Sequence, residues 1–262
     1  MRRQLLTAIG MVIVMTIVCG FAYGLALTGI GEAAFGHQAN GSFVQQNGKD
    51  VGSSLIGQAF TDSKGNPIPK YFQTRPSEAV TSSATDNITV SEASNLGPSN
   101  PLLIGFIPGV NSVGLDGSPS KTNPFATPAD PYCVPVDTTS VAAPVVSPTL
   151  GQKYAKNSDG TYVCDPNTVP ERAIAYRSEF NLAPNAQVPV DAVTASGSGL
   201  DPDISIANAD LQAPTVARVR HLPLSTVQQL IAANTTGRSL GVLGDPGVNV
   251  LNLNLALDRL SA

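Results

Sequence analysis

Few residues of this chain stand at spacings that could carry out chemistry. The two histidines, His37 and His221, lie far apart, with no H-E-x-x-H pattern and no cluster of Cys and His for zinc. There is no G-x-x-x-x-G-K-[ST] phosphate loop, no G-x-G-x-x-G turn and no G-x-S-x-G nucleophile elbow. Residues 195–201 (ASGSGLD) could bind an anion through backbone amides, but a tight turn explains them equally well. The chain contains Ser, His and Asp residues, so residue counts do not exclude a Ser-His-Asp hydrolase, although no motif for such an enzyme is present.

The composition describes a turn-rich chain with little charge. Of 262 residues only 13% are Asp, Glu, Lys or Arg, about half the usual share. The 42% of apolar residues excludes a chain that is disordered throughout. With 15 basic and 19 acidic residues the net charge is -4, so no basic face is available and nucleic acid is excluded as a partner.

The N-terminal residues predict a membrane-spanning helix. No charged residue occurs from Leu5 to Thr28, and such a helix spans roughly 34 Å, enough to cross a bilayer core. Because Arg2 and Arg3 precede this run, the positive-inside rule predicts a cytoplasmic N-terminus. A cleaved signal peptide is the alternative, but signal peptides usually have only about 7 to 15 apolar residues. We expect residues 1–30 to form a single-pass anchor in the cell membrane and residues 31–262 to form one extracytoplasmic domain.

Small residues recur every fourth position in the predicted anchor. They are Thr16, Gly20, Gly24 and Thr28. A face of small residues lets another backbone approach closely, which is how helices associate in lipid. The alternative is that Gly is simply common in membrane helices. We favour a packing face, which predicts a partner inside the membrane.

Two of the three cysteines, Cys133 and Cys164, fall in the predicted extracytoplasmic part, where disulfides persist. A bridge would close a loop of about 30 residues and stabilise the fold by roughly 3 to 4 kcal/mol in the chain-entropy model. Two free thiols are the alternative, and we favour the bridge.

Between the anchor and the last third of the chain, the patterns predict little regular structure. Residues 53–60 (SSLIGQAF) have the composition of a strand. Residues 103–168 are rich in Pro, Gly, Ser and Thr, which predicts a long irregular insertion. Residues 170–180 then predict a short helix, with Ala173, Tyr176 and Phe180 on one side.

The C-terminal residues predict two helices followed by a strand. Asp203 or Ser205 is a suitable cap for a helix that Pro214 interrupts. Ser225 and Gln228 form a capping box for the next helix. Gly237 is a plausible end of that helix, and an alternation typical of a half-buried strand follows at Leu251, Leu253, Leu255 and Leu257. Together these elements predict an α+β fold, in which a single N-terminal membrane helix precedes one mixed domain with a long irregular insertion.

The two predicted helices over residues 205–235, with Arg218 and Arg220 between them, could be taken for a DNA-binding helix-turn-helix. The predicted location outside the cell and the acidic net charge argue against DNA. We therefore expect these arginines to make protein contacts or to bind carbonyl groups.

Seven stretches carry a resemblance to a known family. In order they are Gly41–Ser42, Gly52–Thr61 (GSSLIGQAFT), Tyr71–Ser77 (YFQTRPS), Ser94–Pro101 (SNLGPSNP), Val190–Ser205 (VDAVTASGSGLDPDIS), Pro214–Arg220 (PTVARVR) and Gly244–Leu257 (GDPGVNVLNLNLAL). The chain resembles KdpC, the single-span subunit of the Kdp potassium-transporting P-type ATPase. Members usually have a much shorter segment in place of residues 103–168, so the role of that stretch is not implied by the family.

The resemblance implies an accessory subunit and not an enzyme. In the family, a channel-like subunit conducts potassium, a P-type subunit hydrolyses ATP, and this subunit joins the two from the outer face of the membrane. The family is also described as a catalytic chaperone that raises the ATP affinity of the hydrolysing subunit. ATP is therefore a cofactor by family attribution only, since an external domain has no direct access to cytoplasmic ATP; no metal is expected. The alternative is a free-standing, membrane-anchored exoprotein, either a hydrolase or a solute-binding module.

Polar residues within the matching stretches are the candidate site residues, at an interface or in turns. They are Gln58, Arg75, Ser77, Asn95, Ser99, Asn100, Ser196, Ser198, Asp201, Arg218 and Asn249. Polar groups in Gly-rich turns more often bond within their own chain than to a partner.

Overall fold

The structure is a computed structural model that describes residues 2–77, 91–93, 133, 156–161, 163–164 and 168–260. The chain divides into two compact units, Met1–Leu55 and Ile56–Ala262. Both contain helices and short strands, so the expected mixed helix and sheet composition is confirmed. Most of the expected insertion at residues 103–168, and the motif residues Asn95, Ser99 and Asn100, lie outside the described residues.

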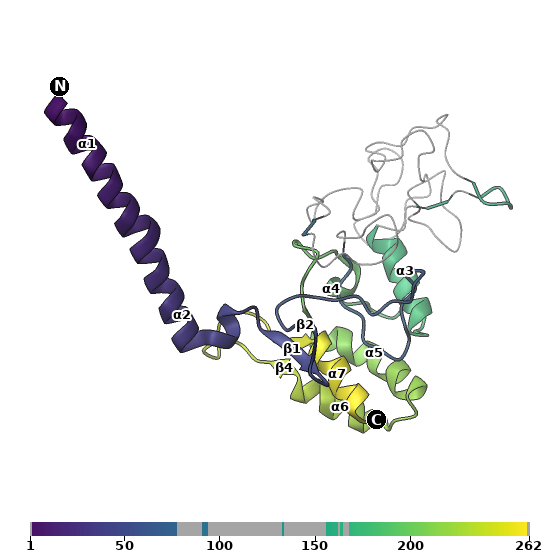
Figure 1. The fold of residues 1–262 in the computed structure, drawn as a ribbon. Coiled ribbons are helices and arrows are strands. Elements are labelled where there is room, and N and C mark those ends of the chain that lie inside the picture. Colours follow the sequence, from purple (N-terminus) through teal and green to yellow (C-terminus); the bar gives the residue numbers. More distant parts are fainter. Residues whose placement is uncertain are drawn as a thin grey trace. The chain divides into compact units, whose positions relative to one another are not determined.

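The first unit begins with one long helix (Figure 1). Its parts are α1 (Arg2–Met15), the π-helix η1 (Thr16–Ala22) and α2 (Tyr23–Ala39). The whole helix has 38 residues. Its most apolar stretch has a mean hydropathy of 2.5, and no residue of that stretch is buried against the rest of the chain. By length and composition it is a candidate to cross a membrane. The expected apolar N-terminal helix is therefore confirmed, and it extends beyond the predicted charge-free run.

The middle of this helix is wider than an α-helix. The Tyr23 N–H donates to the carbonyl of Val18, five residues earlier. Because a π segment holds more residues per turn, Thr16 and Gly20 are rotated relative to each other compared with a uniform α-helix. Further along, Phe35 has non-helical angles of φ -138° and ψ 36°, so the helix is kinked next to a glycine, Gly36.

A hairpin completes the first unit. Strand β1 (Phe43–Gln46) pairs antiparallel with β2 (Lys49–Ser53). Asn47 and Gly48 both have positive φ, 52° and 73°, as a two-residue type I′ turn requires. The hairpin ends are joined, since the Ser53 hydroxyl donates to the Gly41 carbonyl at 2.7 Å. The expected strand over residues 53–60 is wrong, because β2 ends at Ser53 and the chain then leaves the ladder.

The second unit contains the remaining elements. They are α3 (Val169–Glu179), α4 (Val190–Val193), β3 (Asp203–Ile204), α5 (Ile206–Val219), α6 (Leu224–Ala233), β4 (Thr235–Thr236), β5 (Gly247–Asn249) and α7 (Val250–Leu260). The three strands form an antiparallel sheet in the order β3-β5-β4. Helices α5, α6 and α7 pack side by side (Figure 1).

The core of the second unit lies where these three helices meet the sheet. Val216 of α5, Val227 of α6, Val248 of β5 and Leu253 of α7 are fully buried there. Phe72, from the irregular segment before residue 78, is also fully buried in this cluster. Burying a side chain of this size stabilises a fold by about 1.5 to 3 kcal/mol, so these contacts hold the irregular segment against the helices.

The expected helix α3 and the expected start of α5 are confirmed. Ala173, Tyr176 and Phe180 are buried, on one side of α3 as expected, and the Thr168 hydroxyl, which was not predicted as a cap, accepts from the Glu171 N–H. Ser205 caps α5 by accepting from the Asn208 N–H at 3.1 Å. The interruption expected at Pro214 is wrong. Proline removes one backbone donor, but the buried face of α5 continues through Val216, and packing outweighs that loss.

The expected capping box of α6 is wrong, although the helix and its buried Val227 and Ile231 are confirmed. The helix begins at Leu224 after Pro223, whose fixed φ of -60° suits the entry to a helix, and no side chain caps it. Gly237 does not end the helix. Asn234 follows its last turn, and β4 starts immediately afterwards.

The expected C-terminal strand is wrong, because its leucines lie in α7. The strand β5 ends at Asn249, whose side chain accepts from the Asn252 N–H at 3.1 Å and so caps the helix. The alternating leucines at 251, 253, 255 and 257 are all buried because the core surrounds this helix on more than one side. The alternation of leucines at every second position therefore comes from a helix that is buried on several faces, and not from a strand.

Candidate functional site

Two of the family-like stretches are joined by an ion pair. Arg75 Nη1 donates to Asp201 Oδ2 at 2.9 Å, and Arg75 Nη2 donates to Thr194 Oγ1 at 3.4 Å. The arginine side chain is 26% exposed and the aspartate side chain 32%. Water screens such a pair, so its contribution to stability is modest and its main effect is to fix the segments relative to each other. Arg75 Nε is buried without a hydrogen-bond partner in the described part of the chain.

The Gly- and Ser-rich turn at residues 196–199 lies against the same segment. The Ser77 hydroxyl donates to the Gly199 carbonyl at 2.8 Å, and the Ser196 N–H donates to the Pro76 carbonyl at 3.0 Å. Within the turn, the Ser198 hydroxyl accepts from the Leu200 N–H at 3.1 Å. These side chains hold the turn in shape, as polar groups in such turns commonly do.

A third stretch reaches this turn through a glycine. The Gly57 N–H donates to the Leu200 carbonyl at 2.9 Å. A Cβ at Gly57 would overlap the Asp201 carbonyl oxygen and lie 2.9 Å from its carbonyl carbon. Only glycine permits this approach. Gln58 follows, half-buried, and its side chain makes no hydrogen bond within the described part of the chain.

A chain of polar contacts continues from Asp201 to the start of α7. The Asp203 N–H donates to Asp201 Oδ1 at 3.3 Å, and Asn249 Nδ2 donates to Asp203 Oδ1 at 3.1 Å. Burial raises the pKa of Asp203, the Asn249 hydrogen bond lowers it, and the charge of Asp201 raises it further. Asn249 thus links β3 to the cap of α7.

Side-chain amides that the sequence analysis missed hold the irregular segment. Asn254 of α7 accepts from the Phe72 N–H at 2.9 Å and donates to the Phe72 carbonyl at 3.0 Å. Gln212 of α5 does the same for the next residue, accepting from the Gln73 N–H at 2.7 Å and donating to its carbonyl at 3.2 Å. Each amide thereby replaces a neighbouring strand, and we call the pair the amide clasps.

The Gln212 clasp continues into a buried network. Gln212 Nε2 donates to Asn208 Oδ1 at 2.8 Å, and the Tyr176 hydroxyl donates to the same oxygen at 2.7 Å. Asp191 accepts from Asn208 Nδ2 at 3.0 Å and from the Ser205 N–H and hydroxyl, both at 2.8 Å. Burial, and then the charge of Asp191, raise the pKa of Tyr176. Polar residues four apart on an Ala-rich helix face, as at 208 and 212, are the signal that could have identified this network.

Of the two arginines at the end of α5, Arg220 is the one that contacts other elements of the described chain. Arg220 Nη2 pairs with Asp258 Oδ1 at 2.8 Å, and its Nε donates to the Lys70 carbonyl at 2.6 Å. Its guanidinium also lies 4.9 Å from the centre of the Tyr71 ring, whose hydroxyl donates to Asp258. Arg218, the residue expected from the motif, is exposed on α5.

The structure thus brings some predicted residues together and leaves others apart. Six of them lie around the Gly- and Ser-rich turn or along the polar contacts from Asp201 to the start of α7. These are Arg75, Ser77, Ser196, Ser198, Asp201 and Asn249, with Gln58 beside them. The small residues Thr16, Gly20, Gly24 and Thr28 lie in the N-terminal helix. Arg218, on the exposed side of α5, does not join the residues around the turn.

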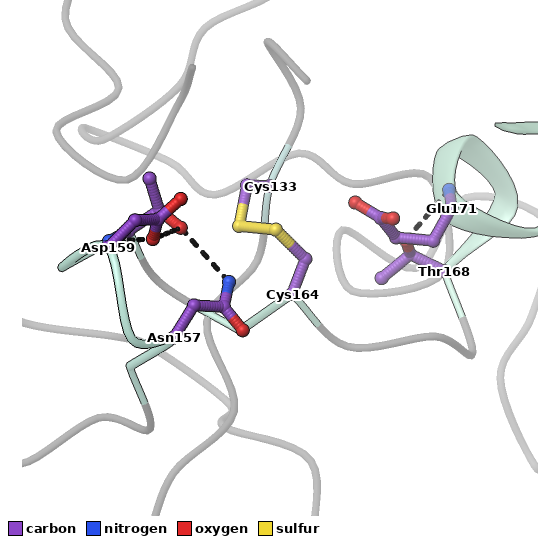
Figure 2. The surroundings of a disulfide bond; sticks show 7 residues. Cys133, Asn157, Asp159, Cys164, Thr168 and Glu171 are labelled. Carbon is purple, nitrogen blue, oxygen red and sulfur yellow. Dashed lines mark hydrogen bonds between the residues drawn. A yellow bond between two sulfur atoms is a disulfide. The ribbon is translucent and has the colours of Figure 1, made fainter. Parts of the chain in front are cut away.

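Cys133 and Cys164 are joined in a disulfide, 31 residues apart in sequence. Figure 2 shows this bond next to a short turn, in which the Asn157 amide donates to Thr161 Oγ1 at 3.0 Å and Asp159 accepts from the same hydroxyl at 2.6 Å. Both cysteines lie inside the expected insertion at residues 103–168, and Cys164 comes shortly before α3.

Arg75 lines two hollows. One, about 270 Å³, also has Arg172, Tyr176, Glu179 and Gln212 in its wall. The other, about 430 Å³, is lined by four aspartates, at 191, 201, 203 and 245. Within the described residues, no group of three or more His, Cys, Asp or Glu side chains is placed to hold a metal ion. The residues around the turn are held by hydrogen bonds and an ion pair within the chain.

Comparison with known proteins covers nearly the whole chain. A model of the family "KdpC: K+-transporting ATPase, c chain" matches residues 5–158 and 151–259. A protein of Mycobacterium tuberculosis, "Potassium-transporting ATPase KdpC subunit", is 39% identical over 260 residues, which is 99% of this chain and 100% of that protein. Proteins of the same name are 37% identical in Bradyrhizobium diazoefficiens, over 100% of both chains, and 38% identical in Burkholderia cenocepacia, over 95% of this chain and 93% of the other. With this extent of identity, and with the matching stretches gathered around one set of turns, the chain belongs to the KdpC family of potassium-transporting ATPase subunits.

Proposed function

We propose that this chain is a non-catalytic subunit of an ATP-driven, high-affinity potassium uptake pump. Its task is to assemble and stabilise a channel-like, potassium-translocating subunit and a P-type subunit that hydrolyses ATP. The match to potassium-transporting ATPase KdpC subunits over the full length of the chain is the observation that carries this proposal. The same match disfavours a free-standing exoprotein, because an independent hydrolase or binding module would not need to resemble a pump subunit throughout.

We further propose that residues 1–30 anchor the chain in the cell membrane and that residues 31–262 lie outside the cell. Arg2 and Arg3 precede the apolar helix, and basic residues favour the cytoplasmic side. The Cys133–Cys164 disulfide supports this orientation, since such bonds persist in oxidising compartments. Residues 103–168 would then form an insertion outside the cell that the disulfide closes into a loop. This insertion could contact the outer loops of the other pump subunits.

A catalytic-chaperone role would act through the assembled complex. With the folded part outside the cell and the ATP inside, this chain would raise the ATP affinity of the hydrolysing subunit by stabilising one arrangement of the subunits. ATP itself is assigned to this chain by family attribution only.

Growth at limiting potassium tests the proposed function. Deleting this chain in a cell that depends on the pump is expected to abolish growth at micromolar potassium while leaving growth at millimolar potassium unchanged. Re-expression of the intact chain is the control and should restore growth. Normal high-affinity uptake without this chain would contradict the proposal.

The membrane packing face predicts the result of a second test. Replacing Gly20 and Gly24 together with Leu is expected to lower the yield of complex on co-purification with the other pump subunits several-fold, because a bulky face prevents close helix approach. The helix itself tolerates the change: a Cβ at Gly24 meets nothing within 4 Å, and one at Gly20 meets only Thr16 Cγ2 at 3.9 Å.

Gly10→Leu is the matched control for this test. A Cβ at Gly10 also meets nothing within 4 Å, and helical geometry places it about 120° around the axis from Thr16. The control should leave the yield of complex unchanged. Equal yields from the wild type and from the Gly20 and Gly24 double variant would remove the packing face from the proposal.

A further inference from the structure

Two phenylalanines that follow the charge-free run of the N-terminal helix are exposed. Phe35 of α2 is 62% exposed and Phe43 of β1 is 56% exposed. In the second unit, the phenylalanines that the structure describes are all buried or half-buried; they are Phe60, Phe72 and Phe180. Exposed phenylalanine in the described part of the chain is therefore confined to the unit that carries the apolar helix.

The length of the helix places Phe35 at the outer boundary of a bilayer. Arg3 marks the inner boundary, since basic residues prefer the cytoplasmic headgroups. From Arg3 to Phe35 the helix is about 48 Å long, at roughly 1.5 Å per residue. At a usual tilt of about 20° it crosses about 45 Å, which is the thickness of a bilayer with both headgroup layers. Phe35 therefore lies among the outer headgroups when Arg3 lies among the inner ones.

The segment after Phe35 is folded back toward the helix. The helix is kinked at Phe35, and its last turn departs from the axis of the long helix (Figure 1). Glu32, which precedes the kink, accepts from Asn40 Nδ2 with both carboxylate oxygens at 2.9 Å. A Cβ at Gly41 would lie 3.3 Å from the ring of Phe43, so this ring covers the residue next to Asn40. Three residues span at most about 10 Å, so Phe43 stays within reach of the same headgroup layer.

The surroundings of the two rings suit a membrane surface. Glu32 is the first acidic residue of the chain, and its carboxylate is hydrogen-bonded at a level where water is scarce. Interfacial segments bury phenylalanine side chains about 5 to 10 Å into the boundary between headgroups and acyl chains. The bilayer that surrounds the apolar helix continues to the level of Phe35, so the surface that covers the helix also covers this ring.

We propose that Phe35 and Phe43 insert into the outer headgroup layer, so that the β1–β2 hairpin lies on the membrane surface. This inference rests on the proposed anchoring of residues 1–30, because the helix sets the level of both rings. One ring lies at the kink and the other on β1, and together they fix the direction in which the chain leaves the bilayer.

Tryptophan at position 43 tests the proposal, because the chain contains no tryptophan of its own. The full chain carrying Phe43→Trp is reconstituted into vesicles of phosphatidylcholine and phosphatidylglycerol. The phosphatidylcholine carries bromine, which quenches indole emission on contact, either near the headgroup end or near the methyl end of its acyl chains. Phe43→Trp is expected to lose emission to the shallow bromine and little to the deep one. Phe35→Trp should behave in the same way.

Two further variants are the controls. Phe21→Trp, within the apolar helix, should be quenched more strongly by the deep bromine than Phe43→Trp is. Leu260→Trp, at a position that is 50% exposed at the end of α7, should be quenched by neither lipid. If Phe21→Trp is not quenched, the proposed anchoring itself fails. If Phe21→Trp is quenched and Phe43→Trp is not, only the inference on the hairpin is overturned.

A photo-reactive side chain identifies what covers position 43 in the assembled pump. With benzoylphenylalanine in place of Phe43, illumination of membranes that hold the whole pump is expected to attach a phospholipid to this chain, seen as added mass. The same side chain in place of Leu260 should acquire no lipid. A cross-link from position 43 to another pump subunit, or to a second copy of this chain, would overturn the inference. Equal lipid attachment at positions 43 and 260 would also overturn it, since exposure alone would then explain the result.

Discussion

Replacing Asn254 with Leu is expected to lower the free energy of unfolding by about 2 to 6 kcal/mol, because two buried backbone groups lose their partner at once. Asn254 bonds both the N–H and the carbonyl of Phe72, and both residues are almost fully buried. Leucine fills a similar space but can satisfy neither group. Urea unfolding of the full chain in detergent, followed by circular dichroism, measures the change from the midpoint and slope.

Asn252→Leu is the matched control for this prediction. Asn252 lies in the same helix and is half-buried, and its side chain makes no hydrogen bond within the described residues. The control is expected to change the free energy of unfolding by no more than about 0.5 kcal/mol, since surface-type substitutions usually have small effects. Equal stabilities of the Asn254 and Asn252 variants would show that the clasp contributes nothing specific.

Gly57→Ala is expected to destabilise the second unit by about 2 to 4 kcal/mol, from overpacking and the loss of one hydrogen bond. The new Cβ would overlap the carbonyl oxygen of Asp201, which is backbone and cannot rotate away. The Gly57 to Leu200 hydrogen bond would lengthen, and the turn that carries Asp201 would shift away from Arg75. The same urea titration measures the loss.

Gly197→Ala, in the same Gly- and Ser-rich turn, separates this clash from a general effect of adding a methyl group. A Cβ at Gly197 meets nothing within 4 Å, and the residue is exposed. The free energy of unfolding of the Gly197→Ala variant should therefore stay within about 0.5 kcal/mol of the wild-type value. If Gly57→Ala were as stable as this control, the close approach of the two stretches would not exist in solution.

The elements that could be predicted from the sequence are those with local signals. The apolar helix follows from a run without charges, and α3 follows from three apolar residues at helical spacing. The cap at Ser205 likewise depends on a side chain and a backbone group three residues apart. None of these requires knowledge of what packs against them.

The elements that could not be predicted depend on contacts between distant residues. The leucines of α7 follow a period of two only because the core covers several sides of that helix. The sequence did not show that Arg220, and not Arg218, makes the contact with another element. The partner of Arg220, Asp258, lies on α7, which was expected to be a strand. The amide clasps link positions about 140 to 180 residues apart, and no local pattern specifies such a pairing.

The hairpin that follows the apolar helix lengthens the chain but adds almost nothing to the distance between the residues at its two ends. The 12 residues from 42 to 53 could extend about 40 Å if they formed an open linker. Instead, the Ser54 N–H bonds to the Ser42 carbonyl at 3.1 Å, so the chain leaves the hairpin almost where it entered. The hairpin therefore folds about 40 Å of contour length back on itself, and the residues at its two ends stay side by side however many residues the two strands contain.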